Sequence, residues 1–79
     1  MQPDSPVRCY VGLKQSTEAV IDGLAKKAYI ALDADEHVRL PFEALCREKN
    51  VPIEFAETKA KLGKTFGINV PAAVAVELK

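Results

Sequence analysis

The chain has 79 residues, enough for one domain, and charged residues make up 28% of it. Lys and Arg together number 11, as do Asp and Glu, so the formal net charge is zero and strong non-specific attraction to polyanions is disfavoured. No stretch is long and apolar enough to cross a membrane, and the N-terminus lacks the basic and apolar regions of a signal peptide, so we expect a cytoplasmic protein with no membrane partner.

The first residues differ in character from the remainder of the chain. Residues 1–6 contain two prolines and no apolar pattern, which predicts a disordered lead-in. A single domain over residues 7–79 is therefore expected. It begins with an apolar run at 7–11 that is typical of a short strand and ends at Gly12.

The next segment has helical periodicity, which predicts a helix over about residues 14–25. Gly23 lies near its end and is expected to help terminate it. One set of side chains repeats at helical spacing and is expected to form the buried stripe: Thr17, Val20, Ile21 and Leu24. The opposite, solvated face then consists of Lys14, Gln15, Glu18 and Asp22.

A continuous apolar run at 28–32 predicts a strand that is covered on both faces. After a polar turn at 33–37, a second helix is expected over about 38–49, with Pro41 in its first turn, where a missing N–H costs little. Its apolar face is predicted to consist of Val38, Phe42, Leu45 and Cys46.

The last part of the chain continues the succession of predicted strands and helices. Residues 50–52 break the second helix, and a short strand follows at 53–55. Thr58 is a suitable N-cap for a third helix over 59–66. After a loop at 67–71, a final strand is predicted over 73–78. The alternation of strands and helices predicts an α/β fold, with one sheet between helices on both faces.

No motif in the chain indicates catalysis or a cofactor. Cys9 and Cys46 lie far apart inside apolar runs, which is typical of buried, reduced thiols. The polar turn holds a candidate metal or acid–base cluster, but its spacing fits no calcium loop and it is a poor zinc set, so helix capping and solubility are the expected roles of Asp33, Asp35, Glu36 and His37. Because no nucleophile–base pair, phosphate loop or dinucleotide fingerprint is present, we expect neither an enzyme nor a small-molecule substrate.

Three segments, taken together, resemble a known family. They are Val-Gly-Leu-Lys-Gln-Ser-Thr at 11–17, Ala-Leu-Asp-Ala-Asp at 31–35, and Leu-Gly-Lys at 62–64 with Gly-Ile-Asn-Val-Pro-Ala-Ala at 67–73. In order and spacing they are similar to the kink-turn-binding ribosomal proteins, most of all to their short bacterial relatives. The resemblance implies a three-layer α/β/α sandwich with a mixed four-stranded sheet. It also implies binding to kink-turn RNA, such as a ribosomal RNA or a riboswitch.

The resemblance also assigns expected RNA contacts. It implies that the head of the first helix reads guanines with Gly12, Lys14 and Gln15. The loop after the third helix would cover an extruded base with Ile68, Asn69 and Val70. Further contacts correspond to Asp35 after the second strand and to Lys59 at the start of the third helix. Glu18 stands where such proteins usually place a phosphate-binding lysine.

The chemistry of these residue types is compatible with the family role, but it also allows plainer interpretations. Unpaired N–H groups at a helix N-terminus suit phosphate or base-edge acceptors, and Lys14 can donate to guanine O6 and N7. Without the resemblance, a solvated turn is the preferred interpretation. Glu18 can pair with Lys14 and would repel phosphate, so it must face away or accept from a base. The lysines at 59, 61 and 64 fit phosphate contacts and a solvated basic face equally well.

The leading prediction is a monomeric, ribosome-associated RNA-binding protein that recognises kink-turn or kink-turn-like RNA by shape and by a few base contacts. The alternative is a protein-interaction module on the same fold that has lost RNA binding, which the zero net charge and Glu18 favour. A small enzyme is a third class, disfavoured because no acid–base pair is recognisable.

Overall fold

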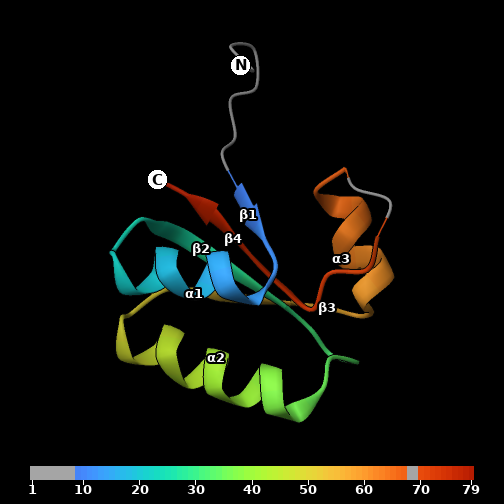
Figure 1. Cartoon of the computed structure of the whole chain (residues 1–79), viewed down its shortest axis with the longest axis horizontal. Coiled ribbons are helices and arrows are strands. Elements are labelled where there is room, and N and C mark those ends of the chain that lie inside the picture. The colour runs from blue at the N-terminus through green and yellow to red at the C-terminus, as the bar shows by residue number, and fades with distance from the viewer. Residues whose placement is uncertain (1–8, 68–69) are drawn as a thin grey trace.

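A computed structural model describes residues 9–67 and 70–79 of the chain. The predicted lead-in and the first two residues of the predicted first strand lie outside these ranges. The elements along the chain are β1 (Cys9–Val11), α1 (Leu13–Ile21), β2 (Ala25–Ala31), α2 (Glu36–Glu48), β3 (Ile53–Ala56), α3 (Lys59–Thr65) and β4 (Val74–Leu78) (Figure 1). This order confirms the predicted alternation.

The strands form one mixed four-stranded sheet in the order β1-β4-β2-β3. Strand β4 is antiparallel to β1 and β2, whereas β3 is parallel to β2. Therefore β1, β2 and β3 all end at the same edge of the sheet, where β4 begins. We name this the convergent edge. Because each helix follows one of these three strands, all three helices also begin there, as Figure 1 shows.

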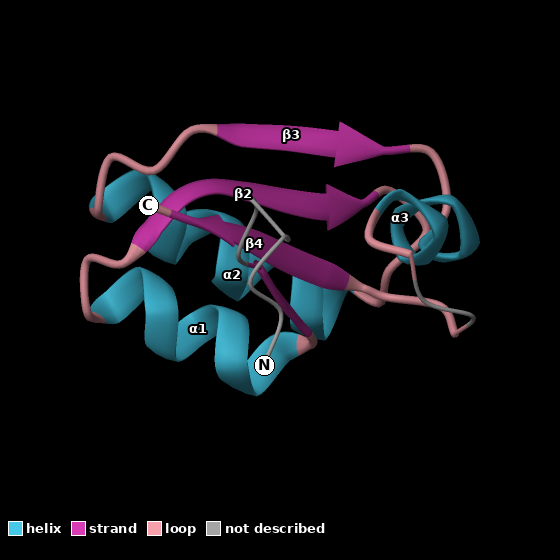
Figure 2. Cartoon of the chain, turned by 90° about the horizontal axis from the view of Figure 1, so that it is seen from above, coloured by secondary structure: helices cyan, strands magenta, loops and turns pink. Residues whose placement is uncertain are grey.

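Each face of the sheet carries its own hydrophobic core. On one face, the buried Val20 of α1 and Phe42 of α2 pack with Ile30 of β2 and with Val74 and Val76 of β4. On the other face, Leu62 of α3 packs with Ala31, Ala72 and Ala75, and Phe66 lies partly buried beside them. Helices α1 and α2 thus form one layer and α3 the other, which confirms the expected three-layer sandwich (Figure 2).

Helix α1 ends earlier than the periodicity predicts. Gly23 adopts a φ of 75°, a left-handed conformation that terminates a helix readily when the residue is glycine. Its N–H donates to the Val20 carbonyl at 3.2 Å, and the N–H of Leu24 donates to the Ala19 carbonyl at 2.9 Å. These paired bonds end α1 at Ile21 and allow β2 to begin at Ala25, earlier than the predicted residue 28.

The predicted buried stripe of α1 is wrong at two positions. The buried residues are Ser16, Ala19 and Val20, whereas Ile21 is 54% exposed and Leu24 is 50% exposed. Ala19 and Val20 belong to the same core cluster as Val74 and Val76 of β4. The Ser16 hydroxyl is accommodated by donating to a backbone carbonyl, that of Tyr10, at 3.4 Å.

Helix α2 starts at Glu36 because the Asp35 side chain caps it, with Oδ1 accepting from the N–H of His37 at 2.8 Å. The prediction that Pro41 lies in the first turn is therefore wrong. Pro41 lies in the second turn, where its missing N–H leaves the His37 carbonyl without the usual helical donor. The predicted apolar face of α2 is confirmed, with Phe42 and Cys46 buried and two neighbours packed against the same core, Val38 and Leu45.

The remaining elements agree closely with prediction. The Thr58 hydroxyl caps α3 by accepting from the N–H of Lys61 at 3.0 Å. Strand β2 is covered on both faces from Ala28 to Ala31, but Leu32 lies beyond it and is 53% exposed. Within the two described ranges, no helix combines the length and hydrophobicity needed to span a bilayer.

Candidate nucleic-acid interface

Residues 72–74, just before and at the start of β4, hold three distant segments together at the convergent edge. Ala72 donates its backbone N–H to the Lys59 carbonyl at 3.1 Å. The Ala73 carbonyl accepts from the N–H of Ala31 at 2.9 Å. The Val74 carbonyl accepts from the N–H of Gly12 at 3.0 Å. We name residues 72–74 the anchor. It fixes the start of α1, the end of β2 and the start of α3 relative to one another.

A side-chain bond adds a fourth segment to this arrangement. Asp33, in the turn after β2, accepts from the N–H of Lys59 at 2.8 Å. Two residues later, Asp35 caps α2. The two aspartates of this turn therefore satisfy the first turns of two different helices, which is the capping role expected for them. Among the described residues, no group of three His, Cys, Asp or Glu side chains is placed to hold a metal ion.

The head of α1 presents polar side chains next to an open backbone. Gly12 has a φ of 110°, a conformation that other residues rarely adopt. A Cβ at this position would meet no atom within 4 Å, so the glycine is needed for its conformation and leaves the approach to the backbone unobstructed. Lys14, Gln15 and Glu18 are all exposed. In the described part of the chain, neither Lys14 nor Glu18 forms an ion pair, so the side chains do not neutralise each other.

The three lysines of α3 are not equivalent. Lys61 pairs with Glu57, and this hydrogen bond lowers the pKa of the Glu57 carboxyl. Lys59 and Lys64 have no such partner among the described residues. Lys59 is half-buried at the convergent edge, where its backbone is held by both the anchor and Asp33, whereas Lys64 is exposed near the far end of the helix.

The loop after α3 leads directly into the anchor. Val70 is 60% exposed, which leaves an apolar side chain free at the convergent edge. Ile68 and Asn69, which the resemblance places in the same contact, lie outside the described residues. The other expected contact residues lie in the first turns of the three helices or just before them: Gly12, Lys14, Gln15, Asp35 and Lys59. Glu18 lies one turn further along α1 and is exposed.

Two residues at this edge have surroundings that the sequence indicates only in part. A capping role is expected for Asp33, but the sequence does not indicate that its partner is α3, 26 positions away. Arg39, in the first half of α2, has a buried Nε atom that finds no hydrogen-bond partner among the described residues. A signal for Arg39 does exist in the sequence, because it is a charged residue at helical spacing with the buried Phe42 and Cys46.

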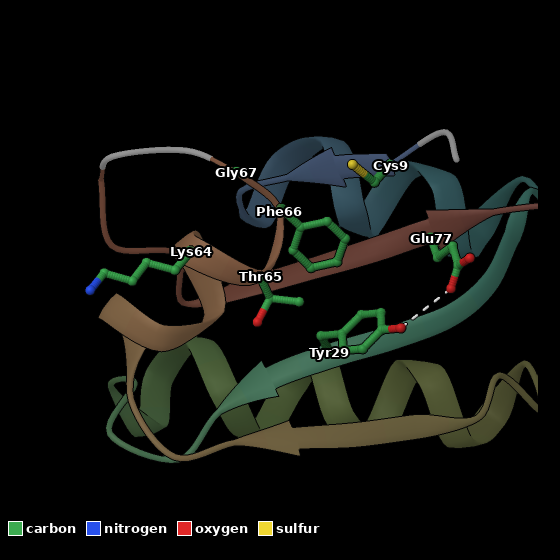
Figure 3. A pocket seen from close by; sticks show the side chains of 7 residues that line it. All are labelled: Cys9, Tyr29, Lys64, Thr65, Phe66, Gly67 and Glu77. Atoms are coloured by element: carbon green, nitrogen blue, oxygen red, sulfur yellow. Dashed lines mark hydrogen bonds between the residues drawn. The ribbon is translucent and has the colours of Figure 1, made fainter. Parts of the chain in front are cut away.

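A hollow of about 520 Å³ lies elsewhere, on the α3 face of the sheet (Figure 3). The Tyr29 and Phe66 rings meet edge to face there, with their centroids 5.1 Å apart, and the Tyr29 hydroxyl donates to Glu77 at 3.3 Å. Burial, and then the nearby Glu77 carboxylate, raise the pKa values of both Tyr29 and Cys9. The thiol and the phenol are therefore protonated at neutral pH, so neither is an activated nucleophile.

Comparison with known proteins agrees with this geometry. The model of the ribosomal protein L7Ae/L30e/S12e/Gadd45 family matches residues 5–79. An RNA-binding protein of Caldanaerobacter subterraneus subsp. tengcongensis is 37% identical over 78 residues, covering 99% of this chain and 95% of the relative.

Two solved structures share the fold. A 15.5 kD RNA-binding protein of Giardia lamblia superposes with a TM-score of 0.82 at 32% identity, over 90% of this chain and 60% of its own longer chain. A Bacillus halodurans protein of unknown function superposes with a TM-score of 0.81, over 90% of this chain and 71% of its own. Because the two sequences are only 20% identical, this similarity shows the shared fold and nothing about function.

Proposed function

We propose that this chain, which belongs to the ribosomal protein L7Ae/L30e/S12e/Gadd45 family, is an RNA-binding protein whose convergent edge recognises a kink-turn or a similarly bent RNA. The observation that supports the proposal is the anchor, because its backbone bonds hold the segments of Gly12, Ala31 and Lys59 together at the convergent edge. The Caldanaerobacter and Giardia relatives are both described as RNA-binding proteins, which supports the RNA-binding part of the proposal.

Each residue of the edge has a role in this proposal. The Gly12 backbone admits the RNA closely, while Lys14 and Gln15 donate to guanine edges in the widened groove. Glu18 and Asp35 accept hydrogen bonds from base amino groups, because a carboxylate next to a phosphate would be repelled. Lys59 neutralises a phosphate. A single-stranded base packs on the apolar loop side chains of Ile68 and Val70, with Asn69 beside them.

Recognition of this kind depends on shape more than on total charge. The chain has no net charge with which to attract RNA at a distance, so its affinity must come from a few contacts made at once. Only the sharply bent conformer of the RNA brings its guanines, phosphates and extruded base within reach together. The protein therefore stabilises that conformer out of an ensemble in proportion to its differential affinity.

A binding titration at fixed, near-physiological salt tests the proposal. It compares a standard kink-turn RNA with the same RNA lacking its sheared G·A pairs. We expect tight binding to the first and weak binding to the second. The double variant Lys14→Ala/Gln15→Ala should lose at least about tenfold in affinity for the intact RNA, since each base contact is worth about 1–3 kcal/mol. Lys49→Ala, at the far end of α2, is the control. Equal binding to both RNAs refutes the proposal.

The proposal has finer parts that separate measurements address. The chain acts as a monomer without a catalytic role, in the cytoplasm, as a single domain over residues 7–79, and its target is a ribosomal RNA or a riboswitch. Light scattering during size-exclusion chromatography tests the monomer. Sequencing of RNA crosslinked to the protein in cells identifies the target and tests ribosome association.

A second candidate function is a protein-interaction module on the same fold. The observation that favours it is the hollow beside Tyr29 and Phe66, which offers a surface of mixed aromatic and polar side chains outside the convergent edge. Capture of the same protein partners before and after nuclease treatment, together with weak binding to every kink-turn tested, would favour this function over the first.

A further inference from the structure

Arg39 is an electrostatic anomaly within the folded chain. Its Nε atom is buried, yet it has no hydrogen-bond partner in the part of the chain that the structure describes. Buried donors in native proteins are nearly always paired, and an arginine cannot shed its charge to avoid the cost. The outer nitrogens of the guanidinium are not among the buried unpaired atoms, and Arg39 forms no ion pair with a described residue. The group is thus half-covered, with its outer end open.

The position of Arg39 directs that open end toward the convergent edge. It shares a helical face with Phe42 and Cys46, both of which are buried against the sheet. Side chains on a helix lean toward its N-terminus, which for α2 is the convergent edge. The Arg39 N–H bonds to the carbonyl of Asp35, the capping residue, which places it one turn into the helix.

Helices α1 and α2 pack against one another and begin at the same edge, as Figures 1 and 2 show. The head of α1, with Lys14 and Gln15, and the first turns of α2, with Arg39, therefore belong to one side of the molecule. An RNA strand that lies along the head of α1 must pass close to the start of α2.

No acidic residue on its own helix pairs with Arg39 in the described part of the chain. Asp35, four residues before it, uses Oδ1 to cap α2. Glu36, three residues before it, is exposed and forms no ion pair with a described residue. Glu43, four residues after it, bonds to Arg47 at 2.5 Å. The guanidinium of Arg39 is therefore available to a partner from outside the chain.

We propose that Arg39 is a phosphate-binding residue of the RNA interface, and that its outer guanidinium nitrogens donate to the backbone of the bound RNA where it lies across the first turns of α1 and α2. This inference rests on the proposed RNA-binding function and extends the interface onto α2. A guanidinium suits the role because it presents several donors in a planar fork that matches phosphate oxygens. In the free protein the guanidinium forms no ion pair with a described residue, which leaves its outer donors available to a phosphate.

The experiment uses the full chain, the intact kink-turn RNA and a series of salt concentrations. Arg39→Met keeps an unbranched apolar stem and removes the charge and the donors. It should weaken binding about tenfold or more, since hydrogen bonds to charged groups are worth about 1.5–3 kcal/mol. It should also reduce the slope of log affinity against log salt by about 0.7–0.9, the effect of one lost phosphate contact. Arg39→Lys should keep most of the slope and recover part of the affinity.

Lys49→Met is the control, because it removes one positive charge from the far end of the same helix, where Lys49 is exposed and forms no ion pair with a described residue. It should leave affinity and slope unchanged. Thermal unfolding without RNA provides a second readout, in which Arg39→Met should be as stable as the parent protein or more stable, since an unpaired buried donor is removed.

The outcomes separate the two proposals. If the parent protein discriminates between the intact and the G·A-deficient RNA, but Arg39→Met changes neither affinity nor slope, the role of Arg39 is overturned and the proposed function stands. A loss of affinity without a change in slope, or an equal loss in Lys49→Met, also overturns it. A marked loss of stability in Arg39→Met would show that the arginine is held within the protein. If the parent protein does not discriminate between the RNAs, both proposals fall.

Discussion

The bond between Asp33 and the start of α3 can be tested by substitution, because the structure offers a closely matched control. Asp33 accepts from the first N–H of α3, whereas Asp35, two residues along the same turn, caps α2. Both aspartates are exposed, both carry the same charge, and both bonds measure 2.8 Å. Replacing either residue by alanine should therefore weaken one helix and leave the other intact.

The expected magnitude follows from the geometry. Loss of a capping side chain at a helix N-terminus costs about 1 kcal/mol, and the freed N–H at this exposed site is hydrated rather than stranded. A domain of this size has about 4–12 kcal/mol of total stability, so the loss is measurable. Asp33→Ala should lower the melting temperature by about 4–8 °C. Asp33→Asn keeps an acceptor and should cost about half as much.

Amide hydrogen exchange separates the two helices. In Asp33→Ala, the N–H of Leu62, which bonds to the Thr58 carbonyl in α3, should exchange about fivefold faster, while that of Arg39 in α2 is unchanged. In Asp35→Ala the pattern should reverse. If either variant speeds exchange equally in both helices, or if Asp33→Ala melts at the parent temperature, then Asp33 does not hold α3 in the way inferred here.

Three further predictions concern the core and the far ends of the helices. Phe42→Ala should cost about 3–5 kcal/mol in urea unfolding, because Phe42 is only 2% exposed, and a smaller loss would show that the site collapses around the gap. Asn50 has a φ of 60°, so Asn50→Gly should change the free energy of unfolding by only a few tenths of a kcal/mol, approximately, whereas Asn50→Ala should lower it by about 1 kcal/mol. Burial, and then Glu43, raise the pKa of the Cys46 thiol from 9.0 to about 11. The unfolded chain therefore loses this proton first, so stability should fall as pH rises from 9 toward 11, with a smaller slope in Cys46→Ala, and equal slopes would contradict the assignment.

Much of the fold is predictable because it depends on local patterns. The face of α2 follows from the spacing of Phe42 and Cys46, and the start of α3 follows from Thr58. The buried face of α1 is harder to predict from its sequence. The large apolar residues Ile21 and Leu24 dominate the periodicity, but the helix ends at Ile21 and buries Ser16, Ala19 and Val20 instead. Which face of a short helix is buried depends on its partners as well as on its own pattern.

In the candidate interface, too, some features are predictable from the sequence and others are not. Lys14, Gln15 and Lys59 can be assigned from the resemblance because their segments keep a recognisable order. The anchor cannot be found in this way, since it acts through backbone atoms and leaves no side-chain signature. The unpaired Nε of Arg39 is likewise visible only once the surroundings of α2 are known.

The anchor also bears on how such a surface can diversify. It comes directly after the loop at 67–71, and its bonds to the other three segments use backbone atoms alone. Loop side chains can therefore be exchanged, as in a graft from a relative with another RNA preference, without changing the register of β4 or the positions of α1 and α3. Target preference and scaffold geometry are in this respect separable, so selection or engineering can alter one while the other stays constant.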